Sequence, residues 1–167
     1  MTPEQFNTIY RSQLSEISRF LARRVAPQEA EDLAADLFEI AWNKRSAIPA
    51  GLELAWLYKT ARYLISNHRR KTQNRSRIFS LLAAPEAAPS AESIALADMG
   101  LGSAWEKLST VDQELLALWA LEGLDAKEIA VVMEITPNAS AIRLTRAKEK
   151  LRNLLAEENF ETEGTLS

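Results

Sequence analysis

Hydrophobic residues recur every three to four positions along most of the chain, which is the spacing of helices that bury one face. No Asn-Gly or Asp-Gly turn separates alternating apolar and polar runs, so the sequence predicts no β-hairpin. We therefore expect an all-α protein. The first three helices are predicted at residues 3–25, 27–45 and 53–72, with a loop at 46–51.

Three capping signals mark the starts of helices in the second half of the chain. They are Ser109 with Asp112, Asp125 with Glu128, and Thr136 followed by Pro137. They predict helices that span 110–123, 126–133 and 137–155. Before them, Gly100 and Gly102 predict weak helical turns that the glycines interrupt.

Residues 81–93, LLAAPEAAPSAES, have the composition of a linker. The sequence thus predicts two small helical domains, 1–80 and 94–156, joined by a flexible connector. The acidic tail, 157–167, is expected to fray. Domains of this size bury only about 60% of their unfolded surface, so each domain is expected to be marginally stable on its own.

The composition excludes several classes of function. The chain has no cysteine and one histidine, so thiol chemistry, zinc fingers and histidine metal clusters are excluded. His68 is predicted to pack in a core. The N-terminus lacks a signal-peptide pattern and no apolar run approaches the roughly 20 residues of a membrane helix, which favours a cytoplasmic protein without membrane insertion. We find no constellation of acid, base and nucleophile, and expect no enzyme activity, cofactor, metal or small-molecule substrate.

The formal net charge of −3 conceals blocks of opposite sign. Residues 54–85 contain seven bases and no acid, and residues 135–156 carry a net charge of +4. Residues 86–134 carry −8. Mixed blocks are often solvated surface, but a long acid-free stretch favours anion binding.

The helices at 126–133 and 137–155, with the connector EITP, match a helix-turn-helix, whose second helix enters the DNA major groove. At 100° per residue, Ser140, Leu144, Ala147, Leu151 and Leu154 face the core. The outward face and its flanks supply the candidate DNA contacts Asn138, Ile142, Arg143, Thr145, Arg146 and Lys150. An exposed Ile142 is suited to a thymine methyl. The alternative is a helical hairpin that packs against a neighbour.

The helix at 53–72 has aromatic and basic residues on the side opposite its apolar face. These candidates for nucleic-acid binding are Trp56, Lys59, Tyr63, Asn67 and Arg70, followed by Lys71. Aromatic rings that stack on bases beside cations that follow phosphates are typical of single-strand binding. Packing of Trp56 and Tyr63 against another helix is an equally open alternative.

The helix at 27–45 has an acidic stripe, which consists of Glu29, Asp32, Asp36, Glu39 and Asn43. Carboxylates at this spacing are compatible with magnesium, but no nucleophile or phosphate-binding glycine loop accompanies them. A stripe that faces solvent or a partner protein is favoured.

Three segments in a fixed order resemble a known family. EAEDLAADLFEIAWNKR (29–45) and AWLYKTARYLISNHRRK (55–71) resemble the first domain of the extracytoplasmic-function group of bacterial sigma factors, and residues 108–155 resemble the second domain. The resemblance implies a dissociable subunit of RNA polymerase that selects promoters. Its expected partners are core RNA polymerase, promoter DNA and an anti-sigma factor, and the polymerase performs the chemistry.

The resemblance also implies a role for each segment. The helix at 29–45, with its acidic stripe, would dock on the clamp helices of the largest polymerase subunit. The loop 46–53 and the helix at 54–71 would bind and melt the −10 element, and residues 126–151 would read the −35 element. The linker would thread toward the RNA exit region.

This chain departs from the family pattern in three places, the first being Gly100 and Gly102, which are expected to interrupt the helix that normally leads into the second domain. Glu134 replaces the usual turn glycine, which predicts a less sharply bent connector. Ala141 stands where the family often has a basic residue, which predicts weaker contacts with DNA phosphates.

Two alternatives remain open from the sequence. A stand-alone helix-turn-helix regulator would bind symmetric half-sites on duplex DNA without polymerase. A helical interaction module without a DNA role would bind a partner with little dependence on salt.

Overall fold

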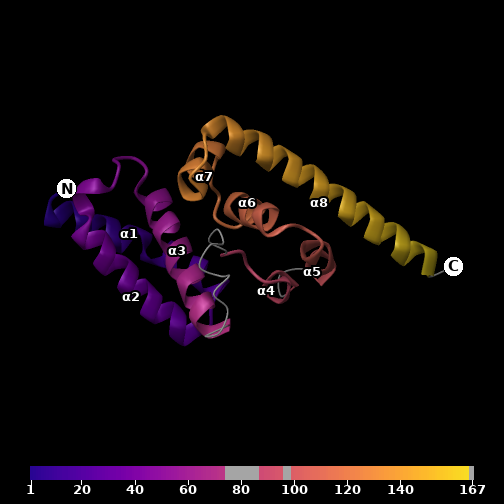
Figure 1. Ribbon diagram of the computed structural model, residues 1–167, viewed down its shortest axis with the longest axis horizontal. Coiled ribbons are helices and arrows are strands. Elements are labelled where there is room, and N and C mark those ends of the chain that lie inside the picture. Colours follow the sequence, from indigo (N-terminus) through magenta and orange to yellow (C-terminus); the bar gives the residue numbers. More distant parts are fainter. Residues whose placement is uncertain (74–86, 96–98, 166–167) are drawn as a thin grey trace. The chain divides into compact units, whose positions relative to one another are not determined.

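The computed structural model describes residues 1–73, 87–95 and 99–165, and all regular secondary structure in these ranges is helical (Figure 1). This confirms the predicted all-α class. The helices are α1 (Pro3–Ala22), α2 (Pro27–Asn43), the short 3₁₀ helix η1 (Arg45–Ala47), α3 (Glu53–Gln73), α4 (Ala91–Ala95), α5 (Met99–Glu106), α6 (Thr110–Ala120), α7 (Ala126–Met133) and α8 (Pro137–Thr165).

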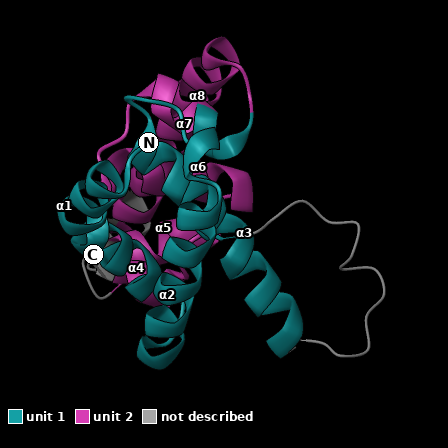
Figure 2. Ribbon diagram, turned by 90° about the vertical axis from the view of Figure 1, so that its left-hand side faces the viewer, with its two compact units in different colours: residues 1–87, 131–134 teal, residues 88–130, 135–167 magenta. Residues whose placement is uncertain are grey.

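The chain divides into two compact units (Figure 2). Unit 1 comprises residues 1–87 and 131–134, and unit 2 comprises residues 88–130 and 135–167. Residues 81–86 of the predicted linker lie outside the described residues, and α4 begins inside the predicted linker, at Ala91.

Unit 1 is built on α1, α2 and α3, each of which packs on the other two. Its centre is aromatic: the rings of Phe20 and Tyr58 lie 4.7 Å apart, and both side chains are buried. Around them pack the buried aliphatic side chains Ile17, Leu21, Leu33, Leu37, Ala41, Leu57, Ala61 and Ile65. Burial of this apolar face, rather than intrinsic propensity, holds the three helices together.

Helix α1 ends at Ala22, three residues before the predicted end, and a buried arginine follows it. The Arg24 guanidinium lies 3.6 Å from the centroid of the Phe20 ring and donates hydrogen bonds to the carbonyl oxygens of Phe20 and Ala87. Because a buried guanidinium needs such acceptors, Arg24 fixes Ala87 on unit 1.

In unit 2, α5 runs through both glycines that were expected to interrupt it, so that prediction was wrong. A Cβ atom on Gly102 would lie 2.7 Å from the Ala95 Cβ and 3.2 Å from the Ala91 carbonyl oxygen. Gly102 therefore permits the close packing of α4 on α5, and this packing outweighs the low helix propensity of glycine.

Helix α8 packs on α5 and α6 and completes the core of unit 2. The buried Trp105 of α5 donates its indole N–H to the Pro89 carbonyl at 2.9 Å, and its own carbonyl accepts from the Gln113 side chain at 2.7 Å. These bonds satisfy the polar groups around a large apolar ring. The helix continues to Thr165, ten residues beyond the predicted end, so the prediction of a frayed tail was wrong.

Candidate nucleic-acid interface

The predicted helix-turn-helix is present as α7, a short turn and α8. Helix α7 begins with a reciprocal capping box, in which the Glu128 N–H donates to the Asp125 carboxylate and the Asp125 N–H donates to the Glu128 carboxylate. Helix α8 begins where the Thr136 hydroxyl accepts the Ala139 N–H, with Pro137 as the first helical residue. Both predicted caps are confirmed.

The turn between α7 and α8 is a Schellman motif. The Ile135 N–H donates to the Ala130 carbonyl and the Glu134 N–H donates to the Val131 carbonyl, which satisfies two orphan carbonyls of α7. Glu134 has a φ of 56°, the left-handed conformation that glycine adopts without steric cost. The expectation of a less sharply bent connector was wrong: Glu134 takes the conformation of a glycine.

This strained turn makes a testable prediction. Replacing Glu134 with glycine should raise the free energy of unfolding by about 1 kcal/mol, because a Cβ in the left-handed region costs roughly that amount. Urea denaturation measures the change. Glu134→Ala, which keeps the Cβ, is the matched control and should not be stabilised. Equal stabilisation by alanine and glycine would contradict a backbone origin.

Helix α8, the second helix of the motif, has the predicted inner and outer faces. Ser140, Leu144 and Ala147 are buried, and Leu151 and Leu154 are partly buried. Ser140 has no hydrogen-bond partner for its hydroxyl, so it contributes no polar contact to the core. The predicted DNA contacts Asn138, Ile142, Arg143, Thr145, Arg146 and Lys150 are all exposed.

Lys150 has a side-chain partner on another helix of unit 2. Its ammonium lies 3.0 Å from a carboxylate oxygen of Asp112, whose side chain is mostly buried near the start of α6. Removal of Lys150 would leave that carboxylate without its cation. Lys150 thus links α8 to α6, and this role was missed because the two residues are 38 positions apart.

The residues of α3 that were predicted to bind nucleic acid differ in their exposure to solvent. Tyr63, Asn67 and Lys71 are exposed, and Lys59 and Arg70 are half-buried. Trp56 is only 8% exposed, so the prediction of an exposed indole was wrong and the alternative, in which it packs internally, holds. Hydrophobic burial of a large ring outweighs its position opposite the main apolar face.

The basic block on α3 also contains structural arginines. Arg62 is buried, and Arg69 donates a hydrogen bond to the Arg24 carbonyl at 3.1 Å. His68 is half-buried on the predicted core side of the helix. Only some of the seven basic residues in 54–85 are therefore available to bind a ligand.

The acidic stripe lies on the outer side of α2. Asp32, Asp36, Glu39 and Asn43 are exposed, and Glu29 is partly exposed. Among the residues that the structure describes, no group of three histidine or carboxylate residues is close enough to hold a metal ion.

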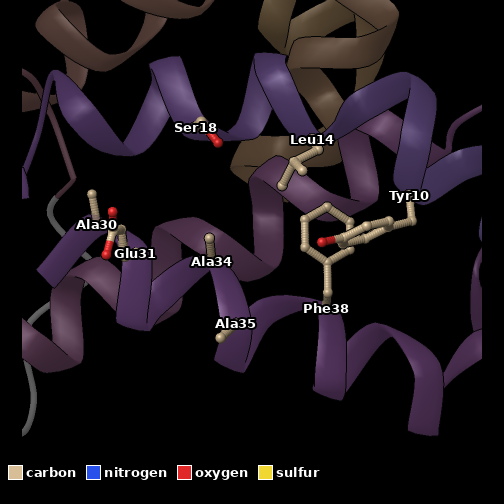
Figure 3. Close-up of a pocket in the computed structure, with 8 residues that line it drawn as sticks. All are labelled: Tyr10, Leu14, Ser18, Ala30, Glu31, Ala34, Ala35 and Phe38. Carbon is tan, nitrogen blue, oxygen red and sulfur yellow. The ribbon is translucent and has the colours of Figure 1, made fainter. Parts of the chain in front are cut away.

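A groove of about 300 Å³ runs between α1 and α2 (Figure 3). Its α2 side consists largely of Ala30, Ala34 and Ala35, whose small side chains leave the space open. Tyr10 and Phe38 lie at one end, with ring centroids 4.8 Å apart in an edge-to-face arrangement. The sequence analysis did not detect this groove, because it depends on how α1 lies across α2.

The arrangement of the described residues provides surfaces for binding. The outer face of α8 offers cations and hydrogen-bonding groups, α3 offers one exposed aromatic ring beside bases, and α2 offers carboxylates. None of the helices in the described ranges is long and apolar enough to cross a membrane.

Residues 99–151 match the family model described as "Sigma-70, region 4". No curated protein matches the chain. Among solved structures, the sigma factor RpoE in complex with the anti-sigma factor NepR from Bartonella quintana is 22% identical, with a TM-score of 0.62 over 92% of this chain and 98% of that chain. CnrH in complex with the cytosolic domain of CnrY is 22% identical, with a TM-score of 0.61 over 93% of this chain and 90% of that chain. The fold of the chain is thus that of these proteins.

Proposed function

We infer that this chain is a sigma factor of the extracytoplasmic-function group, which binds core RNA polymerase and directs promoter-specific initiation of transcription. The observation that carries the proposal is the match of residues 99–151 to region 4 of sigma-70. The fold of the same chain is shared, over 92% and 93% of its length, with two proteins solved as complexes, one of them named a sigma factor. In this role the protein is not itself an enzyme, because the polymerase performs phosphoryl transfer. It acts in the cytoplasm, where promoter DNA and polymerase meet.

Within this proposal, α8 reads the −35 element. Its exposed residues Asn138, Arg143 and Arg146 supply amide and guanidinium donors, which bind base edges and phosphates in the major groove. The Schellman turn and the Thr136 cap fix the path of the backbone between α7 and α8. A fixed path is needed because only the N-terminal half of a recognition helix reaches the base edges.

The −10 element is bound and melted by α3 and the loop before it. Tyr63 supplies an exposed ring on which an unpaired base can stack, and Asn67 and Lys71 lie on the exposed side of the following turns. Trp56 is 8% exposed, and in this proposal it supports the surface from the interior.

Core polymerase docks on α2 through the acidic stripe. Its four carboxylates at helical spacing fit a basic helix of the polymerase clamp, since opposite charges on two facing helices steer association and fix register. The adjacent groove between α1 and α2 offers apolar surface beside these charges.

The docking surface predicts a specific loss. Asp36→Lys should weaken the affinity for core polymerase by about tenfold or more, because it places a cation against a basic partner. Fluorescence anisotropy of labelled protein titrated with core enzyme measures this affinity. Glu4→Lys, a charge reversal at an exposed acid on α1, is the matched control and should bind as the unmodified protein does. Equal affinities for both variants would exclude the stripe as the docking surface.

The two solved structures that share this fold contain NepR, an anti-sigma factor, and the cytosolic domain of CnrY as bound proteins. We extend this to the present chain and expect an anti-sigma factor that competes with core polymerase for the acidic stripe or the α8 face. Competition in the anisotropy titration identifies which surface the anti-sigma factor covers.

A further inference from the structure

The centre of the exposed face of α8 is apolar, although its margins are basic and polar. Ala141, Ile142 and Thr145 lie within a 100° arc of the helix, and all three are exposed; we call them the methyl patch. Ile142 is 43% exposed, which is a large exposure for an aliphatic side chain on the outer face of a helix.

Thr145 contributes a methyl group rather than a hydroxyl to this patch. Its hydroxyl donates a hydrogen bond to the Ala141 carbonyl at 3.0 Å, within the helix. A threonine whose hydroxyl is bound to the backbone four residues earlier has its γ-methyl left for an external ligand. The three side chains therefore present mainly aliphatic groups, with the threonine hydroxyl proton engaged inside the helix.

The surroundings of the patch identify its ligand as nucleic acid rather than protein. Asn138 lies one turn before Ile142, Arg146 lies one turn after it, and Arg143 lies on the flank. One acid, Glu149, is exposed on the same face four residues after Thr145, and the cations around the patch outnumber it. Cations and an amide around an apolar centre match the major groove, where phosphates border base edges and the only apolar group is the C5-methyl of thymine.

We propose that the methyl patch reads thymine C5-methyl groups in the −35 element. The proposal rests on the function inferred above and adds what that function leaves open, namely which bases are selected. Ile142 and Thr145 favour thymine at adjacent base steps, and Asn138 favours adenine next to them, since an amide pairs with adenine N6 and N7. The absence of a basic residue at position 141 then contributes to the specificity. A long cationic side chain there would separate the methyl patch from the DNA bases.

The test removes single methyl groups from DNA. The preferred element is first selected from a randomised upstream region with the full-length protein assembled on core polymerase. Each thymine in it is then replaced by deoxyuridine, which lacks only the C5-methyl. We expect the affinity of the assembled complex to fall by about fourfold at one or two positions, the amount expected for one buried methyl.

Two variants connect the effect to Ile142. With Ile142→Ala, deoxyuridine at one of the sensitive positions should have no further effect, as a double-mutant cycle requires. Val111→Ala removes an equally exposed aliphatic side chain on α6 and should keep the full fourfold sensitivity.

The outcomes separate this inference from the proposed function. If the complex initiates at a selected element but no deoxyuridine substitution changes its affinity, or if Ile142→Ala keeps the full sensitivity, methyl reading is refuted and the sigma function stands. If Ile142→Ala weakens binding to core polymerase instead, the patch contacts protein and the inference fails. If no element is selected at all, the proposed function fails together with the inference.

Discussion

Replacement of Trp56 with alanine should destabilise unit 1 by about 3–5 kcal/mol, which is the usual cost of truncating a buried tryptophan. The indole is 8% exposed, and its neighbours Ala55, Leu57 and Tyr58 are buried as well, so the truncation leaves a cavity in a tightly packed segment. Because a domain of this size has little stability to spare, most of the variant should be unfolded near physiological temperature.

Thermal unfolding followed by circular dichroism measures this effect. Tyr63→Ala is the matched control: its ring is 39% exposed on the same helix, and its loss should leave the melting temperature nearly unchanged while it impairs promoter opening. A Trp56→Ala protein with unchanged stability and a specific defect in DNA melting would show that the indole faces DNA after all.

The second large effect concerns the arginines of α8. Arg143→Ala and Arg146→Ala should each weaken binding of the polymerase complex to its −35 element, by roughly 5- to 150-fold where the guanidinium binds a base edge in bidentate geometry. Both side chains are exposed on the outer part of the recognition helix.

Salt dependence distinguishes the two kinds of contact for each arginine. Loss of a phosphate contact should lower the slope of log affinity against log salt by about 1 and weaken all sequences alike. Loss of a base contact should instead relax the sequence preference at one position. Arg152→Ala is the matched control, because this exposed residue lies six positions beyond Arg146, past the N-terminal half of the helix that reaches base edges. If all three variants bind as the unmodified protein does, α8 does not meet DNA.

Much of the fold could be predicted because local signals agree with the tertiary packing. Thr136 and the pair Asp125 and Glu128 mark helix starts that the structure reproduces, since caps satisfy backbone groups whatever surrounds the helix. The inner face of α8 was also predicted correctly, because the helix has a single apolar stripe and that stripe packs against the core.

The failures have a common physical origin in contacts with other segments, which helical periodicity does not report. Gly102 was expected to break a helix, but close packing against Ala95 requires a residue without a side chain. Lys150 was assigned to DNA alone, although Asp112 lies within ion-pair distance. Helical periodicity placed Trp56 on an outer face of its helix. Periodicity alone does not show what else packs against that face, and Trp56 is in fact buried.

The charge distribution explains why DNA binding should depend on polymerase. The chain carries a net charge of −3, and some of the basic residues on α3 make contacts inside the protein. An isolated molecule therefore has little electrostatic attraction for duplex DNA. Docking through α2 would bring both DNA-binding surfaces to the promoter together, which raises the effective concentration of each.

Run-off transcription with purified core polymerase tests this account most directly. The protein should direct initiation at one position on the template that carries its selected promoter, and omission of either the protein or the core enzyme should abolish both the transcript and specific DNA binding. Specific binding of the protein alone to a symmetric duplex site, without any transcript from the reconstituted complex, would instead identify a stand-alone helix-turn-helix regulator and contradict the sigma function.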